Sequence, residues 1–337
     1  MKRLICLVLC ILCLTGCTAQ TSKKQYTATY LDLFDTVTTV TGLADSKEEF
    51  ETAAQQIHDA LLRYHRLFDI YNVYEDLNNL KTVNDRAGEA PVAVDREIIQ
   101  FLSHCKKYHA LTGGLVNAAM GSVLKLWHDA RTDSIADPQN AYLPDEKELA
   151  EAAGHTDIQK LVIDEENSTV FLTDEKLRLD VGAIAKGWAA QRVAENAPSG
   201  LLISVGGNVC ATGPKGENTP WVVGINHPDG GENYLHTLYI SKGCVVTSGD
   251  YQRFFVVDGK AYHHIIHPDT RMPSNLWQSV TVVCEDSGLA DALSTALFLL
   301  PYEEGLALAE KCGAEAMWMD GSGNRLYSHG FHKLIRT

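Results

Sequence analysis

The chain has 337 residues, of which 45% are hydrophobic and 21% are charged, and its formal net charge is −14. These values are ordinary for a globular protein with a large core. A chain this acidic has no electrostatic footprint for nucleic acid, so we expect no nucleic-acid partner.

The first residues are typical of an export signal. Lys2 and Arg3 precede an apolar run over residues 4–14, and the letters LTGC follow, ending at Cys17. The run is too short for a membrane-spanning helix, which needs about 20 residues, but it suits a signal peptide. The LTGC ending is similar to a bacterial lipobox, in which the cysteine is diacylated; an ordinary signal peptide cleaved nearby is the alternative. The predicted boundaries are a signal peptide over 1–16, a tether over 17–26 and one folded domain over 27–337.

Lipid attachment at Cys17 would hold the folded domain outside the cytoplasm. Two acyl chains bury enough methylene groups to anchor a protein stably to a lipid bilayer. We therefore expect a membrane-anchored lipoprotein on the extracytoplasmic face of the cell membrane. In a cell with two membranes, this is the periplasmic side of the inner membrane.

Five of the nine cysteines lie beyond Cys17. Their number is odd, no C-x-x-C occurs among them, and most lie in apolar runs or helical patterns, where a free thiol behaves as a small hydrophobe. We expect them to be core residues, with neither a disulfide framework nor a zinc site: Cys105, Cys210, Cys244, Cys284 and Cys312.

Hydrophobic patterning predicts many short elements along the domain. Residues 27–41 are rich in Thr, Val and aromatics and predict a strand. Short strands separated by turns dominate from residue 155 onwards, and a polar segment between Pro138 and Pro144 predicts a surface loop. Helical periodicity predicts helices over 46–68, 95–111, 183–196, 287–300 and 302–312. This order predicts an α+β fold of mixed, largely antiparallel sheets with packed helices.

Residues 180–187, DVGAIAKG, join an expected strand (KLRLD) to an expected helix through a glycine. The first N–H groups of a helix have no partner inside it and favour an anion, and Lys186 adds a positive charge one turn in. The junction predicts a phosphate site, although such junctions also occur in proteins without one. It is neither a P-loop nor a dinucleotide fingerprint.

Residues 287–296, SGLADALSTA, predict a helix with Ser287 as its N-cap. Asp291 and Thr295 are four residues apart and therefore share one helical face. A carboxylate and a hydroxyl are hard oxygen ligands, and Mg²⁺ typically binds one or two carboxylates together with phosphate oxygens and water. The alternative is a helix-capping aspartate with a threonine that faces solvent.

Three histidines follow one another closely at His263, His264 and His267. Neighbouring residues of a strand face opposite ways, so His263 and His264 cannot both serve one site. One of them could act as a general base near neutral pH. A zinc hydrolase that uses all three is the rival interpretation, without an H-E-x-x-H pattern to support it.

Five segments occur together in one order, and together they closely resemble the ApbE family of FAD:protein FMN transferases. They are D-x-G-A-I-A-K-G at 180–187, G-G-N at 206–208, T-S-G-D-Y at 247–251, H-H-I-I-x-P-x-T at 263–270 and A-D-A-x-S-T-A at 290–296. Weaker matches around Phe34, Tyr71 and Asn117 extend the resemblance over nearly all of the mature chain. Family members are often lipoproteins, which agrees with the N-terminal signal.

The resemblance implies an ApbE-like (T-fold-like) architecture and a Mg²⁺-dependent reaction with FAD as substrate. FMN would pass from FAD to a threonine or serine hydroxyl of a target protein, with release of AMP. Membrane redox-complex subunits or other extracytoplasmic proteins would be the acceptors. Carried over by position, Asp291, Thr295 and the backbone carbonyl of Ala183 would hold Mg²⁺, and His264 would activate the acceptor hydroxyl. The implied contacts with FAD are Asp180, Lys186, Ile265, Phe34, Tyr71, Val116 and Asn117.

The chain departs from the usual family pattern at positions that concern substrate contacts and leave the metal pair untouched: Phe34, Asn117, His267 and Arg271. Two alternatives to the transferase stay open. One is an FAD pyrophosphatase, which uses water and releases FMN and AMP; Tyr71 in the aromatic pocket favours the transferase over it. The other is a non-catalytic lipoprotein that binds a flavin.

Overall fold

The computed structural model describes residues 23–231 and 233–336. The predicted signal peptide, Cys17 and most of the predicted tether lie outside these residues. Within them, no helix is both long and apolar enough to cross a membrane.

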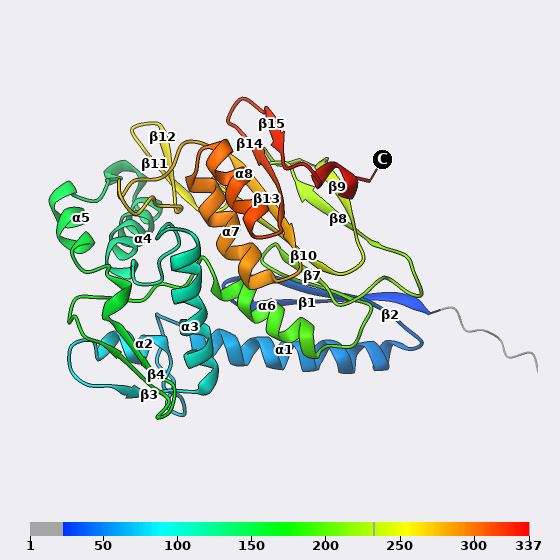
Figure 1. Ribbon diagram of the computed structural model, residues 1–337, viewed down its shortest axis with the longest axis horizontal. Coiled ribbons are helices and arrows are strands. Elements are labelled where there is room, and N and C mark those ends of the chain that lie inside the picture. Colours follow the sequence, from blue (N-terminus) through cyan, green and yellow to red (C-terminus); the bar gives the residue numbers. More distant parts are fainter. Residues whose placement is uncertain (1–22, 232, 337) are drawn as a thin grey trace, which may run out of the picture.

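An eight-stranded antiparallel sheet forms the centre of the structure (Figure 1). Its order is β1-β2-β6-β7-β10-β13-β14-β15, so strands from both ends of the chain share one sheet. The strands are β1 (Lys24–Leu33), β2 (Thr36–Ala44), β6 (Leu201–Val205), β7 (Asn208–Ala211), β10 (Gly243–Gly249), β13 (Ser279–Cys284), β14 (Glu315–Met319) and β15 (Arg325–Tyr327).

Three smaller antiparallel sheets complete the strands of the described chain. They are β3-β5-β4, the hairpin β8-β9 and the hairpin β11-β12. Their strands are β3 (Val92–Ala93), β4 (Leu161–Asp164), β5 (Thr169–Leu172), β8 (Trp221–Asn226), β9 (Tyr234–Ile240), β11 (Phe254–Val257) and β12 (Lys260–His263).

Two helices, α6 and α7, lie side by side against β7, β10 and β13 of the central sheet, and α1 packs along β1 and β2 (Figure 1). The helices are α1 (Lys47–Phe68), α2 (Leu80–Asp85), α3 (Arg96–Leu111), α4 (Gly121–Ala136), α5 (Glu146–Ala153), α6 (Ala185–Asn196), α7 (Ser287–Leu299) and α8 (Tyr302–Lys311). Helices packed on antiparallel sheets confirm the predicted mixed α+β class.

Two strand predictions were wrong. Residues 27–41 form a hairpin, because the chain reverses at Phe34 and Asp35 with φ of 53° and 51°. The segment KLRLD is extended, but its only ladder contact among the described residues is a bridge from Arg178 to Met120. The amide of Asn84 takes the place of a neighbouring strand, since it donates to the oxygen of Leu179 at 3.0 Å and accepts from the nitrogen of Leu179 at 2.7 Å.

The predicted N-cap of α7 was off by one residue. Asp286 holds the cap position, where its carboxylate accepts the N–H of Leu289 at 2.7 Å, and Ser287 is the first helical residue. Both residue types cap helices well, so composition alone does not choose between them.

Gly187 sets the close approach of α6 to α7. A Cβ atom at this position would lie 2.3 Å from the carbonyl oxygen of Ser287 and 2.5 Å from Cβ of Asp291. We expect Gly187→Ala to force the helices apart and lower the free energy of unfolding by about 1–3 kcal/mol, measured by urea denaturation. Gly321→Ala is the matched control, because no atom lies within 4 Å of its added methyl group. Equal stability of the two variants would contradict this account.

Candidate active site

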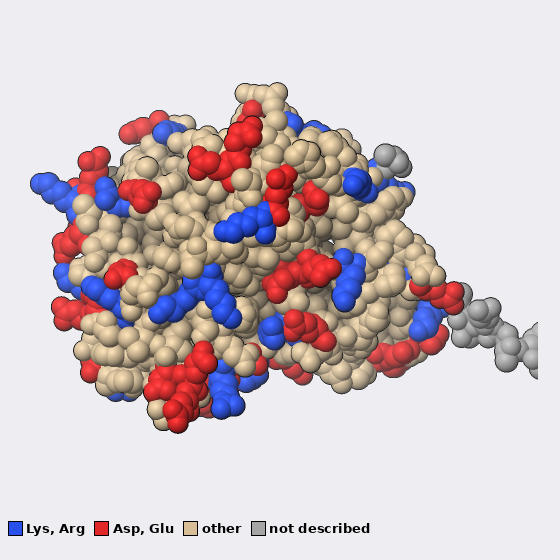
Figure 2. Space-filling view, viewed as in Figure 1, with Lys and Arg blue, Asp and Glu red and all other residues tan. Residues whose placement is uncertain are grey.

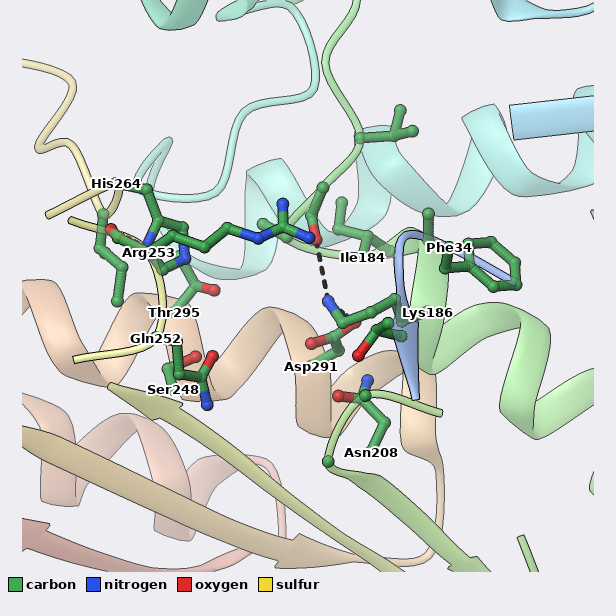
Figure 3. Close-up of a pocket in the computed structure, with 18 of the residues that line it drawn as sticks. Phe34, Ile184, Lys186, Asn208, Ser248, Gln252, Arg253, His264, Asp291 and Thr295 are labelled. Atoms are coloured by element: carbon green, nitrogen blue, oxygen red, sulfur yellow. Dashed lines mark hydrogen bonds and ion pairs between the residues drawn. The ribbon is translucent and has the colours of Figure 1, made fainter. Parts of the chain in front are cut away.

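A cavity of about 860 Å³ opens between the central sheet, α4, α6, α7 and the turn that joins β1 to β2. Its volume is near the upper end of the usual range for ligand pockets, so it suits a large ligand. Every site residue predicted within the described chain lines it: Phe34, Tyr71, Val116, Asn117, Asp180, Ala183, Lys186, His264, Ile265, Asp291 and Thr295. Figure 3 labels five of them, namely Phe34, Lys186, His264, Asp291 and Thr295.

Asp291 is a buried carboxylate, only 4% exposed, at the middle of α7. Asp291 therefore does not cap its own helix, where Asp286 holds the cap position. Its Oδ2 accepts the N–H of Gly187 at 2.8 Å and lies 3.9 Å from Nζ of Lys186. Burial raises the pKa of Asp291, against the opposing effects of Lys186, Gly187 and Asn208. A cation bound beside this carboxylate would offset the cost of burying its charge.

The first turn of α6 differs from the predicted open anion site. The N–H groups of Ile184 and Ala185 already donate to the oxygen of Val181, and the N–H of Gly187 donates to Asp291. A carboxylate of the protein thus occupies part of the helix N-terminus, where negative charge is favoured. An anion at this site would depend more on side-chain cations than on backbone N–H groups.

The potential metal ligands near Asp291 are oxygen atoms. The Thr295 side chain, one turn further along α7, and residue Ala183, just before α6, line the same cavity (Figure 3). A carboxylate, a hydroxyl and a backbone carbonyl are hard ligands of the kind that Mg²⁺ prefers. These residues therefore fit the implied metal.

Two arginines in the cavity were missed by the sequence analysis. Arg131 comes from α4 and Arg253 from the turn after β10, and neither has a salt-bridge partner in the described part of the chain. Burial and the nearby Arg253 lower the pKa of the Arg131 guanidinium. Figure 3 shows the Arg253 side chain extending from the His264 side of the cavity toward Lys186. Arg131 is half-buried and its Nη2 lies 3.2 Å from Nδ1 of His128, whereas Arg253 is exposed. Two guanidinium groups in one cavity are suited to a bound anion.

His264 opens into the cavity, and its Nδ1 lies 3.2 Å from the carbonyl oxygen of Arg253. Because a carbonyl only accepts hydrogen bonds, we assign the proton to Nδ1, which leaves Nε2 with its lone pair. His264 is exposed to the cavity, and desolvation by the groups around its ring, together with Arg253 and His263, lowers the pKa of His264 to about 3. The imidazole is therefore neutral near pH 7 and able to accept a proton.

The zinc interpretation of the three histidines is wrong. Both ring nitrogens of His263 are engaged, since Nε2 lies 2.5 Å from the oxygen of Ser274 and Nδ1 accepts the N–H of Ile265. Nδ1 of His267 accepts the N–H of Asp269 outside the cavity. Among the described residues, no group of three His, Cys, Asp or Glu side chains could hold a metal ion. His263 is thus a buried structural histidine, 7% exposed.

An aromatic wall faces these polar groups. The ring of Tyr71 packs against that of His128, with centroids 5.3 Å apart, and Phe34 meets His65 edge-on at 5.5 Å. Tyr71 is 55% exposed, but desolvation by the groups near its hydroxyl and the nearby Asp180 raise its pKa to about 12, so the hydroxyl stays neutral. Phe34 adopts a left-handed conformation that is costly for a bulky residue, and this places its side chain at the mouth of the cavity.

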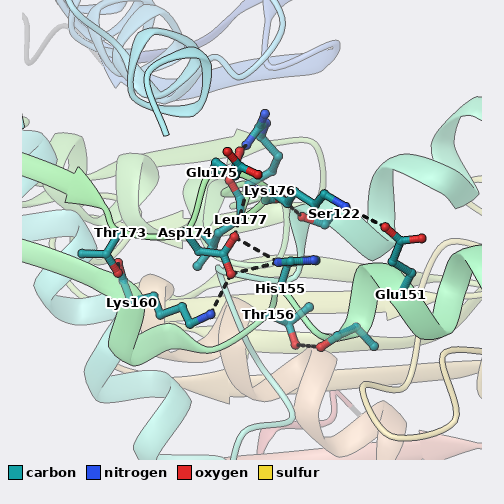
Figure 4. A network of polar contacts seen from close by, with 12 residues as sticks. Ser122, Glu151, His155, Thr156, Lys160, Thr173, Asp174, Glu175, Lys176 and Leu177 are labelled. Carbon is teal, nitrogen blue, oxygen red and sulfur yellow. Dashed lines mark hydrogen bonds and ion pairs between the residues drawn. The ribbon is translucent and has the colours of Figure 1, made fainter. Parts of the chain in front are cut away.

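Asn117 lines the cavity and also forms hydrogen bonds with two backbone groups. Its amide donates to the oxygen of Thr156 at 2.8 Å and accepts the N–H of Ala119 at 2.9 Å. The residue beside Thr156, His155, joins Lys160 in binding the carboxylate of Asp174 (Figure 4). Burial raises the pKa of Asp174, but the hydrogen bonds from Lys160 and His155 outweigh it and keep that pKa below its ordinary value. This network fixes the loop that carries Val116 and Asn117.

A buried carboxylate, several cations and a neutral histidine that line one large cavity are typical of an enzyme active site. The sequence model of the ApbE family matches residues 34–318. The chain therefore belongs to the ApbE family.

Relatives and solved structures agree with this assignment. A FAD:protein FMN transferase of Treponema pallidum is 31% identical over 93% of this chain and 89% of its own length. Another, from Klebsiella pneumoniae, is 33% identical over 74% of this chain and 79% of its own. The crystal structure of the ApbE protein of Thermotoga maritima has a TM-score of 0.82 and 30% identity, over 93% of this chain and all of that one (100%). These similarities confirm the predicted family and the prediction of an enzyme.

Proposed function

We propose that this enzyme transfers FMN from FAD to a threonine or serine hydroxyl of a target protein and releases AMP. The activity named for its relatives supports this proposal. The observation that carries it is that Asp291, Thr295, Lys186 and His264 line one cavity together with two arginines. Transfer of a phosphoryl-type group needs positioning and charge neutralisation more than covalent chemistry, and these residues supply both.

The cations would bind the diphosphate of FAD. Lys186 lies 3.3 Å from the carbonyl oxygen of Gly182 and 3.9 Å from Asp291, so its ammonium group is held near the proposed metal position. Arg253 extends toward Lys186 from the His264 side, and Arg131 lines the same cavity, so both would contact the remaining phosphate oxygens. Their charges would stabilise the negative charge that develops on the leaving AMP.

Asp291, Thr295 and the carbonyl of Ala183 would hold Mg²⁺, which when bound would neutralise phosphate charge and orient the diphosphate. Gly187 positions the Asp291 carboxylate for this role, because its N–H donates to the carboxylate and favours the ionised form. The N–H of Gly187 occupies Oδ2, which leaves Oδ1 available for a cation.

His264 would act as the general base. Its Nε2 would accept the proton of the acceptor hydroxyl as that oxygen bonds to the phosphorus of FMN and the bond to the AMP oxygen breaks. The carbonyl of Arg253 fixes the ring orientation through Nδ1. Phe34, Tyr71, Val116 and Ile265 would line the flavin or adenine pocket and exclude water from the reacting groups.

The test is incubation of the purified protein with FAD, Mg²⁺ and a threonine-containing acceptor peptide, followed by mass spectrometry. We expect a gain of one FMN on the peptide and an equal amount of free AMP. A serine peptide should react in the same way, and a peptide with alanine at the acceptor position should not. Free FMN with an unmodified peptide would contradict the transferase and support the pyrophosphatase, whereas an unchanged FAD pool would support a binding protein.

We also propose that Cys17 is lipidated and that the enzyme works on the extracytoplasmic face of the cell membrane. Membrane redox-complex subunits would then be the acceptors, because tethering confines enzyme and acceptor to one surface at raised effective concentration. The support is the sequence pattern at residues 1–17. The measurement is the mass of the N-terminal peptide from cell membranes, and an unmodified Cys17 in the mature protein would refute the anchor.

A further inference from the structure

Three cysteines lie in one row across the central sheet. Cys244 on β10 is the register partner of Cys210 on β7 and of Cys284 on β13. Register partners on antiparallel strands project from the same face of a sheet. This face is covered by α6, since Sγ of Cys244 lies 3.9 Å from Oε1 of Gln191 on that helix. The three thiols are therefore neighbours beneath the helices that carry the active-site residues.

Cys210 and Cys244 are the close pair. Their Sγ atoms lie 3.0 Å apart, and the two residues are only 1% and 2% exposed. Directly opposed residues of antiparallel strands have Cα atoms about 4.5 or 5.5 Å apart, and both separations fall within the range of roughly 4.4–6.8 Å that a disulfide spans. Cys284 turns its thiol instead to the carbonyl oxygen of Asp286, at 3.1 Å.

We propose that Cys210 and Cys244 form a disulfide between β7 and β10 when the chain folds in an oxidising compartment, and that Cys284 stays a free thiol. Such a pair departs from the expectation of free core cysteines, which is the state of all five in the structure, and their odd number leaves at least one thiol free. One thiolate attacks the disulfide of an oxidant, itself a protein or small-molecule disulfide, and forms a mixed disulfide. The second thiolate then displaces the remaining sulfur of the oxidant, so that both oxidant sulfurs end as thiols, which take up the two electrons and the two protons that the cysteine pair gives up.

The packing indicates when this bond forms. The hydrogen bond to Cys210 and burial raise the pKa of the Cys244 thiol, so the folded pair holds little of the thiolate that attacks a disulfide. Oxidation must therefore precede the closure of α6 and α7 over the sheet. Once the helices have packed, the same burial protects the disulfide from reductants. The cross-link would restrain β7 and β10 and stabilise the fold mainly by limiting the unfolded chain.

Peptide mapping tests this proposal independently of the proposed reaction. The full-length protein is exported to an oxidising compartment, purified, and unfolded in excess alkylating agent without reductant. Trypsin places each thiol on its own peptide: Cys210 on 193–215, Cys244 on 243–253 and Cys284 on 272–311. We expect peptides 193–215 and 243–253 to be linked, to separate on reduction, and peptide 272–311 to carry the alkyl group.

Two variants sharpen the result. Cys284→Ser should keep the link, and Cys210→Ser should lose it and leave Cys244 alkylated. Alkylation of both Cys210 and Cys244 in the wild-type protein would overturn the proposal. A link between Cys244 and Cys284 would overturn it equally, because it would show that the shorter sulfur contact does not select the partner.

Discussion

Replacement of Asp291 by asparagine should lower the rate of FMN transfer by roughly 10²- to 10⁴-fold without unfolding the protein. Asparagine keeps the volume of the side chain and can still accept the N–H of Gly187. It removes the carboxylate that we propose for Mg²⁺, so the metal should no longer raise the melting temperature. Transfer assays over a range of Mg²⁺ concentrations, with thermal melts alongside, measure both effects.

The stability of the metal-free variant gives an independent check. Burial raises the pKa of Asp291, so the folded state binds its proton more tightly than the unfolded state does. A group whose pKa is raised by folding stabilises the protein at low pH, and this stabilisation is lost as the pH rises. At neutral pH, the buried charge of Asp291 therefore lowers the free energy of unfolding. Asp291→Asn should therefore melt no lower than the wild type when Mg²⁺ is absent.

Asp286→Asn is the matched control on the same helix. Asp286 lies outside the cavity, and asparagine caps helices as well as aspartate does. This variant should keep both activity and stability. Near-normal Mg²⁺-dependent transfer by Asp291→Asn would show that the proposed metal position is wrong.

The sequence was most informative where function and packing impose the same local pattern. The long amphipathic helix α1 begins after its Ser46 cap as its periodicity predicts, and Asp291 and Thr295 share one face of α7 because helical spacing requires it. The motifs around His264 and Lys186 also identified residues that the fold brings to one cavity. Each of these inferences depends on contacts within about one helical turn or on an ordered motif.

Contacts between distant segments explain what the sequence analysis missed. The segment KLRLD has the alternation of a strand, but the side chain of Asn84, 95 residues earlier, takes over its hydrogen bonds. The free helix N-terminus expected at α6 is partly occupied by Asp291, 104 residues away from Gly187. No local pattern encodes such partners.

The sequence analysis missed Arg131 for a second reason. The buried face of its helix, α4, mixes Val123 and Trp127 with Gly121, Ala130 and Ser134, so the apolar stripe that identifies a helix is weak there. The cation belongs to the site only because α4 lies over the cavity. Arg253, by contrast, follows the segment T-S-G-D-Y by two residues, so attention to the flanks of that motif could have found it.

The rate of transfer should depend on neutral His264, which we propose as the general base. We expect His264→Gln to lower transfer by roughly 10²- to 10⁴-fold while leaving FAD affinity within a few-fold of the wild type, because glutamine can still donate to the carbonyl of Arg253 but cannot act as a base at Nε2. His267→Gln is the matched control, since His267 lies outside the cavity. Loss of FAD binding in step with the loss of transfer would indicate that His264 binds the substrate instead.

The pH profile separates a base from a binding group. Desolvation, Arg253, His263 and Lys186 lower the pKa of His264, against the opposing hydrogen bond to Arg253, to about 3. A lowered pKa keeps the imidazole neutral at acidic pH, so kcat/KM, which reports the free enzyme, should stay level between pH 8 and about pH 5. With a histidine of ordinary pKa near 6.5, kcat/KM would instead fall about tenfold per pH unit below that value.

Bound FAD brings negative charge beside the His264 ring and raises its pKa, so the acid limb of kcat should lie at higher pH than that of kcat/KM. A fall of kcat/KM centred near pH 6.5, absent from His264→Gln, would show that the cavity cations do not act on His264 as the structure indicates.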